Sequence, residues 1–588
     1  MKRGSSAPGD PVHPVVILNI RIRTSRWNRY GEATEMGWIH RLWKLSGQVE
    51  ARRFQQSLRD PERAQRRVLK TILAVHRQAR GISNHASFRR LPLTEYADYE
   101  PAVRRMMATG ENPLTREAVR LLEPTSGSSG GSKLIPYPPL LQKQFQAAIQ
   151  PWLVDTFRRY PEVLEGRHYW SISPNTGPDT RWTAQSRNDG GGGASSFPAI
   201  RPHSLLDRPS RIPVGFDDDA AYLAGPEAWA ARRIWAVPEW LSRVSDMRSF
   251  EYLTVLFLLR CADLRLISVW HPSFLALMMD HLERHWESAA RDIHDGTIPR
   301  EIHLPSGGRK QLKSALRADP KRSRELHKCG PNPDRIWPNL RVISCWAGIH
   351  QEPWLARIAA NFPRAAIAPK GLIATEGIAS IPWKGDRVLA VNSHFFEFLD
   401  ESGIVHPAWD VREGAEYRLL LTTGNGFLRY QTHDIVRVTG FHDQTPRIEF
   451  IARDATSDMV GEKLHEAHVA ELLHRLLPEV PFKMLAPWAE GERRGYMLCC
   501  RLPEGMEPEG VLEALERELC ENYHYAHARR LGQLEELRFL EMDDGAAERF
   551  RRKMAARNGC GVGDVKYSGL YRGLDWGEAM GTKCKVKG

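Results

Sequence analysis

Residues 125–133 read Thr-Ser-Gly-Ser-Ser-Gly-Gly-Ser-Lys. No packed helix or strand favours such a run of hydroxyl-bearing residues and glycines. Glycine lets the backbone adopt positive φ and approach a ligand closely, while serine and threonine supply hydroxyl donors. Lys133 adds a positive charge at the end of the run. The stretch therefore predicts a loop that binds the phosphates of a nucleotide.

The spacing of this loop departs from the P-loop pattern G-x-x-x-x-G-K-S/T, because Leu134 follows Lys133. A flexible Gly/Ser linker is the alternative interpretation. Apolar residues border the loop closely, at 121–122 and 134–137, and favour a loop held between ordered segments. We expect Lys133 to act catalytically as a counter-charge. Phosphate contacts are expected from Thr125, Ser126, Gly127, Ser128, Ser129 and Gly130.

Two later segments extend the pattern. Residues 374–377 read Ala-Thr-Glu-Gly, and residues 429–434 read Arg-Tyr-Gln-Thr-His-Asp. Together with the loop they resemble elements of adenylate-forming enzymes, which activate a carboxylate as its acyl-AMP. Four further stretches are similar to the Gretchen Hagen 3 family of acyl-acid amido synthetases: 336–346 (IWPNLRVISCW), 370–382 (KGLIATEGIASIP), 394–399 (HFFEFL) and 461–464 (GEKL). The resemblance runs in order along most of the chain.

The resemblance implies roles for three residues. Thr375 is expected to contact a phosphate, Glu376 to hold Mg²⁺, and Asp434 to accept hydrogen bonds from both ribose hydroxyls. For Thr375 and Glu376 the competing interpretation is a helix N-terminus with an acidic first turn. His433 stands where the family usually has glycine. Its side chain is expected to crowd the backbone beside the nucleotide and to shift the loop or weaken nucleotide binding.

Two lysines near the C-terminus complete the implied site. Lys566, in Gly-Asp-Val-Lys, resembles the late lysine that reaches into the adenylation site, where it is expected to act catalytically. Lys463 is expected to contact the nucleotide. A solvated surface lysine is the alternative at either position. The family's hinge corresponds to Arg453-Asp454, so a mobile domain would deliver Lys566 for adenylation and then swing away.

The chain of 588 residues is too long for one core and predicts two or more domains. Helices are expected over 61–76, with Pro61 in the first turn, and over 238–260. Short β-rich runs, among them 342–345, alternate with helices as far as residue 373, which predicts an α/β fold with parallel sheets. After residue 388 the expected strands are closely spaced, which predicts an antiparallel or β-barrel-like lobe. They are 388–392, 416–422, 427–431, 435–441 and 447–451. The expected units are a disordered extension (1–35), a large adenylation domain (36–452) with a flexible insertion rich in proline and glycine (174–211), and a small mobile α+β domain (453–588).

Composition excludes several classes of protein. The net charge of +12 raises the possibility of nucleic-acid binding, but the basic residues lie beside acids and no aromatic-interleaved basic patch is present, so no nucleic-acid partner is expected. The most apolar region, 252–282, is interrupted by Arg260, Asp263 and Arg265, so no membrane association is expected. The eight cysteines are scattered without a C-x-x-C pair, which indicates reduced thiols and a cytoplasmic location.

These observations predict an ATP-dependent ligase that forms an acyl-AMP from a small carboxylic acid. The resemblance implies that the acyl group then passes to the amine of an amino acid or another small amine. An acid-thiol ligase that makes an acyl-CoA is one alternative. A degenerate, non-catalytic member that binds acid or nucleotide is another, motivated by His433. The acyl pocket is expected to draw on residues 238–260 and 344–346.

Overall fold

The computed structural model describes residues 32–77, 82, 85–125, 133–171, 211–215, 225–244, 246–305, 307–347, 351–453, 456–457, 459–460, 462, 464–491, 493–543, 545–558, 565, 569–572 and 586–587. Apart from Arg211, the insertion predicted at 174–211 lies outside them. Among the described residues, no helix has the length and apolar character needed to cross a membrane.

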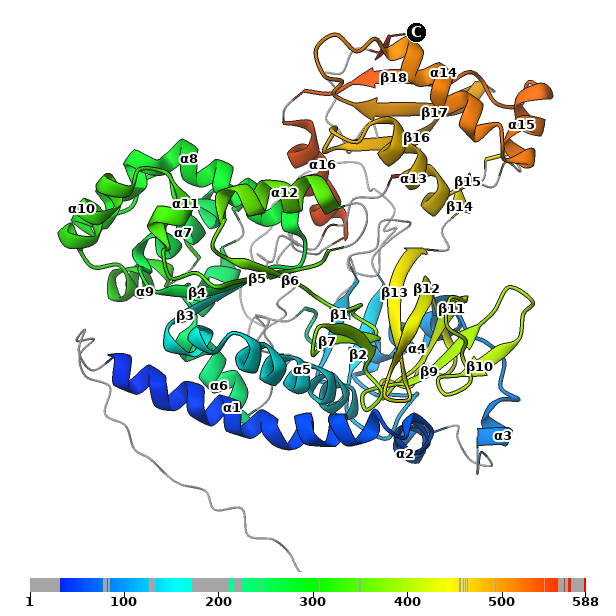
Figure 1. The fold of residues 1–588 in the computed structure, drawn as a ribbon, viewed down its shortest axis with the longest axis horizontal. Helices are drawn as coiled ribbons and strands as arrows, with labels where there is room; N and C mark the ends of the chain where they lie inside the picture. The colour runs from blue at the N-terminus through cyan, green and yellow to red at the C-terminus, as the bar shows by residue number, and fades with distance from the viewer. Residues whose placement is uncertain are drawn as a thin grey trace, which may run out of the picture.

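Two helices at the N-terminal end run along the outside of the molecule. Helix α1 (Glu32–Ser57) packs against α5 (Pro139–Arg159), α6 (Gly225–Ile234) and the 3₁₀ helix η1 (Pro161–Glu165) (Figure 1). It begins at Glu32, inside the stretch 1–35 that was expected to be a disordered extension. Helix α2 (Pro61–Val75) begins as predicted, with Pro61 in its first turn and the Asp60 carboxylate accepting from Arg63 N.

A four-stranded parallel sheet forms one half of the large unit. Its order is β3 (Arg167–Trp170), β4 (Leu264–Ser268), β5 (Val342–Cys345) and β6 (Ala366–Pro369). These largely buried strands are connected through helices α7 (Met247–Arg260), α8 (Pro272–Asp295), α9 (Gly308–Ala315), α10 (Pro320–Cys329), α11 (Pro333–Ile336) and α12 (Glu352–Asn361) (Figure 1). The alternating strands and helices confirm the predicted α/β class.

The helix predicted over 238–260 is divided in two. A 3₁₀ helix, η4 (Glu239–Arg243), precedes α7, and Asp246 lies between them. The Asp246 carboxylate accepts from Ser249 N at 2.9 Å and starts α7 as an N-cap. The apolar pattern continues through the break, which explains why one long helix was predicted.

A seven-stranded antiparallel sheet forms the other half of the large unit. Its order is β10 (Val405–Pro407), β9 (Phe395–Leu399), β11 (Glu416–Thr422), β12 (Tyr430–His442), β13 (Thr445–Arg453), β8 (Asp386–Leu389) and β7 (Ser380–Trp383). The prediction of two separate strands at 427–431 and 435–441 is wrong, because the single strand β12 spans residues of both. Its register against β11 shifts between Arg418 and Leu420, so residues 432–434 form a bulge. One hydrophobic core, from Ile39 to Ile448, joins both sheets.

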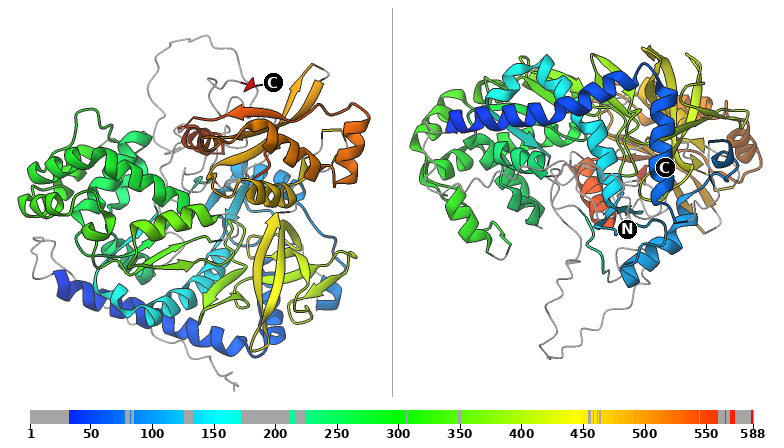
Figure 2. Two further views of the ribbon diagram at one scale, coloured as in Figure 1. Left: turned by 45° about the horizontal axis from the view of Figure 1, so that its top comes forward. Right: turned by 90° about the horizontal axis from the view of Figure 1, so that it is seen from below.

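The C-terminal unit is an α+β sandwich. Its sheet has the order β16 (Lys483–Glu490), β17 (Arg493–Cys500), β18 (Arg538–Glu541) and β19 (Val586–Lys587). Helices α13 (Glu466–Leu476), α14 (Pro508–Leu519) and α15 (Tyr523–Arg530) cover one face, and α16 (Ala546–Asn558) covers the other. Side chains alternate between the faces, since Leu485 and Leu498 join the first core while Met484 and Met497 join the second. The two-residue strands β14 (Thr456–Ser457) and β15 (Leu464–His465) precede this unit, which Figure 2 shows from two further directions.

Candidate functional site

A hairpin carries the predicted phosphate loop. Strands β1 (Leu121–Pro124) and β2 (Leu134–Tyr137) pair in antiparallel register, and Thr125 and Lys133 extend the pairing by one step. Thr125 N donates to Lys133 O at 2.8 Å, and Lys133 N donates to Thr125 Oγ1 at 3.2 Å. The two ends of the stretch 126–132 are therefore held side by side. The predicted phosphate contacts Ser126, Gly127, Ser128, Ser129 and Gly130 lie outside the described residues.

The Lys133 ammonium points toward tyrosines from two other segments. Its Nζ donates to the Tyr430 hydroxyl at 3.1 Å and lies 5.6 Å from the ring centre of Tyr96. Tyr96 is the first residue of α4 (Tyr96–Thr109), which the four-residue helix α3 (His85–Phe88) precedes, and Tyr430 is the first residue of β12. Lys133 therefore connects the hairpin to the strand that carries Asp434.

Thr375 and Glu376 occupy a tight turn. Ile373 and Ile378 form a β-bridge, and Ala374 and Gly377 exchange hydrogen bonds of 2.9 and 3.2 Å. No helix starts at this turn, so the competing interpretation as a helix N-terminus is wrong. A Cβ added at Gly377 would lie 3.0 Å from the His394 ring, which explains the glycine at this position.

The turn lies against the β1–β2 hairpin. The Tyr137 hydroxyl donates to Thr375 O at 3.0 Å, which joins residues 238 positions apart. Burial raises the pKa of Tyr137 well above its usual range, and the nearby Glu123 and Glu376 carboxylates raise it further. Burial also raises the pKa of Tyr96 to about 12, again with a contribution from Glu376. Both phenols are therefore neutral hydroxyl groups at physiological pH, close to a buried carboxylate.

The bulge in β12 sets the positions of His433 and Asp434. Asp434 is buried, and its N–H donates to Thr432 Oγ1 at 3.1 Å. His433 has a φ of 62°, in the left-handed region that favours glycine. This conformation gives a physical reason for the glycine that the family usually has here. The His433 ring pairs with Glu95, the Nε2–Oε2 distance being 2.9 Å, and Gln431 donates to the other Glu95 oxygen at 3.0 Å.

A buried ion pair anchors the beginning of the same segment. Arg429 donates to Glu397 Oε2 at 3.0 Å, and both side chains are almost fully buried. Burial raises the pKa of Glu397, and the Arg429 guanidinium opposes that rise. Thr94 exchanges backbone hydrogen bonds with Arg429 and Gln431 on either side of Tyr430. The sequence pattern gave Arg429 no individual role, and the structure makes it a support for the strand that carries Asp434.

The two C-terminal lysines lie outside the described residues, but their neighbours do not. Glu462 is fully buried, and its carboxylate accepts from the N–H groups of Met459 and Val460. On either side of Lys566, Val565 is buried in the second C-terminal core, and Gly569 and Tyr571 form backbone hydrogen bonds with Leu485 of β16. Both flanks of Lys566 are thus attached to the C-terminal sheet.

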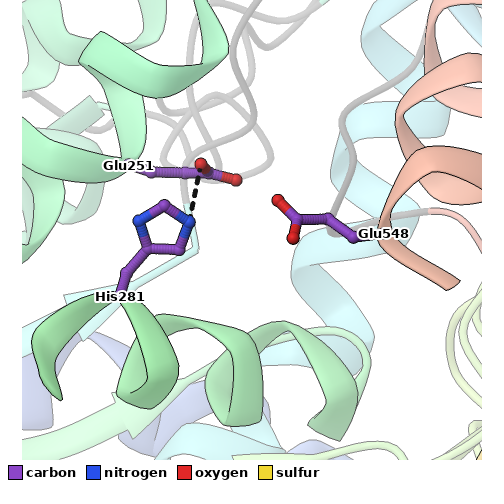
Figure 3. Close-up of side chains that lie close together, drawn as sticks. All are labelled: Glu251, His281 and Glu548. Carbon is purple, nitrogen blue, oxygen red and sulfur yellow. Dashed lines mark ion pairs between the residues drawn. The ribbon is translucent and has the colours of Figure 1, made fainter. Parts of the chain in front are cut away.

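A second polar cluster lies where α16 meets the large unit. Figure 3 shows Glu251 of α7 and His281 of α8 facing Glu548 of α16. Within the described part of the chain, this is the only group of histidine, cysteine and acidic side chains spaced closely enough to hold a metal ion. Arg552 Nη2 lies 2.8 Å from Glu251 Oε2 and also bonds Glu548, so a guanidinium already supplies the positive charge. We therefore interpret the cluster as an ion-pair network.

Comparison with known proteins gives consistent matches. A model described as the GH3 family N-terminal domain matches residues 50–367, and one described as the GH3 family central domain matches residues 387–453. The chain is 25% identical over 465 residues to indole-3-acetic acid-amido synthetase GH3.2 of Arabidopsis thaliana, covering 72% of this chain and 79% of the relative. It is 26% identical over 473 residues to a probable indole-3-acetic acid-amido synthetase, GH3.4, of Oryza sativa subsp. japonica, covering 71% and 70%.

Solved structures show the same fold. The GH3.15 acyl acid amido synthetase superimposes with a TM-score of 0.71 at 16% identity, covering 90% of this chain and 95% of that chain. The complex of AtGH3.15 with 2,4-DB gives a TM-score of 0.73 at 16% identity, covering 92% and 97%. The arrangement of a large α/β unit followed by a small α+β unit is therefore shared with these proteins.

Proposed function

Because the chain belongs to the GH3 family, as the sequence resemblance predicted, we propose that it is an ATP-dependent acyl-acid amido synthetase. In this proposal the enzyme converts a small carboxylic acid to its acyl-AMP and transfers the acyl group to an amino acid or another small amine. Two relatives named as indole-3-acetic acid-amido synthetases support the amide product.

One observation carries the proposal. Two hydrogen bonds, from Tyr137 to Thr375 and from Lys133 to Tyr430, join the hairpin that carries the predicted phosphate loop to the Thr375–Glu376 turn and to the strand that leads to Asp434. These segments are far apart in the sequence, and they were assigned from the sequence to the phosphates, the Mg²⁺ and the ribose of a single nucleotide. Their convergence supports one nucleotide site.

The first half-reaction is in-line displacement at the α-phosphorus of ATP. A carboxylate oxygen of the acid forms the new P–O bond, and the bond to pyrophosphate breaks. Charge builds on the phosphate oxygens, so fixed positive groups and hydrogen-bond donors supply most of the catalysis. In the proposal Lys133 provides such a charge, the loop residues 125–130 and Thr375 contact the phosphates, and Asp434 holds the ribose.

The buried Glu376 carboxylate fits a hard cation, because Mg²⁺ prefers one or two carboxylates together with phosphate oxygens. When bound there, Mg²⁺ would neutralise charge on the phosphates. In the second half-reaction the amine attacks the acyl carbonyl, AMP leaves, and the nitrogen loses a proton. Because the acyl carbonyl is already activated, this step involves no attack on a phosphorus atom.

We also propose that residues 36–452 and 453–588 act as separate domains with the hinge near Arg453. The separate hydrophobic cores of the C-terminal unit support this division. Lys566 then serves adenylation and Lys463 contacts the nucleotide. A cytoplasmic location belongs to the same proposal and is supported by the described cysteines, none of which forms a disulfide bond.

The test is a product assay on the purified full chain. Benzoate, indole-3-acetate and hexanoate are each incubated with ATP and Mg²⁺, and pyrophosphate release is measured. The acid with the highest rate is then incubated with ATP plus a mixture of amino acids, or with ATP plus coenzyme A, and the products are identified by mass spectrometry. We expect acid-dependent pyrophosphate release and an amide. Exclusive thioester formation would identify an acyl-CoA ligase, and the absence of acid-dependent pyrophosphate release would identify a non-catalytic binding protein.

A further inference from the structure

We propose that Lys370 binds the carboxylate of the acid substrate, at the carboxyl end of the parallel sheet. The inference rests on the proposed function and goes beyond it, because it assigns the acid-binding charge to one residue. Ligands of open α/β sheets bind at the carboxyl ends of the strands. Lys370 directly follows β6, and its N–H donates to Cys345 O of the neighbouring strand at 2.8 Å.

The Lys370 side chain is buried at this edge, with 5% of its surface exposed. Its Nζ donates to Ser268 Oγ, the last residue of β4, at 2.9 Å. Ser268 lies in register with Ser344 of β5, and residues directly opposite in neighbouring strands point to the same face of a sheet. Lys370, Ser268 and Ser344 therefore share one face.

Ser344 supplies an independent observation. Its hydroxyl is buried and has no hydrogen-bond partner among the described residues. A buried hydroxyl without a partner is unfavourable, so an unpaired donor normally indicates an absent ligand or water. A carboxylate bound by Lys370 would accept from Ser268 and Ser344 with its remaining lone pairs.

Tryptophans surround the same position and indicate the class of acid. The Lys370 Nζ lies 4.4 Å from the ring centre of Trp270 and 5.6 Å from that of Trp152. Trp270 follows Ser268 by two residues and Trp346 follows Ser344 by two, so both lie on the face that carries the lysine. Both indoles are partly exposed. Flat apolar surfaces beside an ammonium suit an aromatic or indolyl carboxylic acid.

The backbone connects this position rigidly to the Thr375–Glu376 turn. A Cβ added at Gly371 would lie 1.9 Å from Ser380 O, so the chain after Lys370 is pressed against β7. Leu372 N also donates to Ser380 Oγ at 3.0 Å. A carboxylate on Lys370 and a phosphate on Thr375 would thus be held by one short, fixed segment. Such positioning favours attack of one on the other.

The test compares Lys370→Met with the wild-type enzyme, using the acid selected in the product assay. Methionine keeps an apolar stem and removes the charge. We expect the KM for the acid to rise on the order of 100-fold, because a buried charge loses its partner. The KM for ATP should stay within twofold of the wild-type value.

Ser344→Ala should raise the KM for the acid several-fold. The matched control is Lys384→Met, an exposed lysine whose Nζ lies 5.9 Å from the ring centre of Trp383, and it should change neither constant.

Calorimetric titration of the acid and of its primary carboxamide gives a second readout that needs no turnover. Wild-type protein should prefer the acid strongly, and Lys370→Met should bind the two ligands about equally. A folded variant with an unchanged preference and an unchanged KM for the acid would overturn the proposal, and a rise confined to the KM for ATP would assign Lys370 to a phosphate instead. If Lys370→Met does not fold, loss of the carboxylate preference in Ser344→Ala still supports the proposal, and full retention opposes it. Absence of wild-type pyrophosphate release would contradict the proposed function, whereas the titrations would still report on Lys370.

Discussion

Arg552 Nη2 of the C-terminal unit lies 2.8 Å from Glu251 Oε2 of the large unit, and both side chains are more than two-thirds buried. The neighbouring Arg551, which is fully buried, donates to Ser273 Oγ at 2.9 Å. Helix α16 is thus attached to α7 and α8 by charged hydrogen bonds rather than by a shared apolar core. Such contacts can break and re-form when two domains move.

The first prediction concerns this contact. Arg552→Gln should weaken it by about 1 kcal/mol, because a partly buried ion pair is lost. Amide exchange in α16 and α7 should then accelerate several-fold, measured by hydrogen exchange with mass spectrometry. The control is Arg549→Gln on the same helix, because Arg549 pairs with Asp543 inside the C-terminal unit. Equal exchange in both variants would mean that the Arg552 pair does not hold the units together.

The second prediction concerns the phosphate and metal contacts. Lys133→Ala and Glu376→Gln should each leave the fold intact and lower the rate of acyl-AMP formation on the order of 100-fold or more, as loss of a preorganised charge does. Acid-dependent pyrophosphate release measures this rate. Glu376→Gln should also need a higher Mg²⁺ concentration to reach its half-maximal rate. Lys143→Ala, at an exposed position on α5, should be unaffected. If both variants form acyl-AMP at rates near wild type, the nucleotide does not bind at these residues.

The third prediction separates the two half-reactions. If Lys566 serves only adenylation, Lys566→Ala should slow acyl-AMP formation but convert supplied acyl-AMP and amine to amide at close to the normal rate. The lysine stabilises charge on the phosphate, whereas the amine attacks a carbonyl that is already activated. Single-turnover measurements of each step provide the readout. Equal impairment of both steps would indicate a structural lysine or a domain that does not alternate.

The fourth prediction concerns pH. Burial lowers the pKa of His394 to about 3, and neither ring nitrogen has a hydrogen-bond partner among the described residues. An unfolded histidine has a pKa of about 6.5, so between pH 6.5 and 3 the unfolded state binds the extra proton. The stabilisation from this group is therefore complete above pH 6.5. It is lost as the pH falls, by up to about 1.4 kcal/mol per pH unit.

His394→Phe should consequently show a smaller decrease in Tm between pH 7 and pH 5 than the wild-type protein, measured by calorimetry. Phenylalanine suits the site because the ring packs against Phe145 and Phe396. His524→Phe, at an exposed position on α15, should retain the full decrease. An identical decrease in the His394 variant would show that this ring binds a proton as readily in the folded protein as in the unfolded chain.

Elements with a strong local pattern were predictable from the sequence. Strands β5 and β11 have the bounds 342–345 and 416–422 that the sequence predicted, because a β-branched run marks the first and a leucine-rich run marks the second. Strand β12 was divided in error, because Thr432 and His433 interrupt its alternation while the bulge continues the pairing. Helix α16 was not predicted, because its charged residues include Arg551, whose burial depends on contact with the distant Ser273.

In the candidate site too, features that depend on contacts between distant segments could not be predicted from the local sequence. The Thr375–Glu376 turn followed from resemblance, whereas local physical reasoning alone favoured a helix start. Tyr137 was visible only as the end of an apolar run, and its hydrogen bond to Thr375 depends on tertiary packing. Lys370 lies in the stretch 370–382, which was singled out from the sequence. Its proposed role depends on the register of β4 and β5, and no local sequence pattern specifies that register.

Glu95 accepts from both Gln431 and His433, and its own N–H donates to Asp98 at the start of α4. One carboxylate thus belongs to two segments that lie more than 300 residues apart in the sequence. The free energies of residues that share a partner are not additive. The start of α4 and the bulge beside Asp434 therefore form a thermodynamically coupled pair, so that any displacement of Asp434 also changes the stability of a helix outside the strand that carries it.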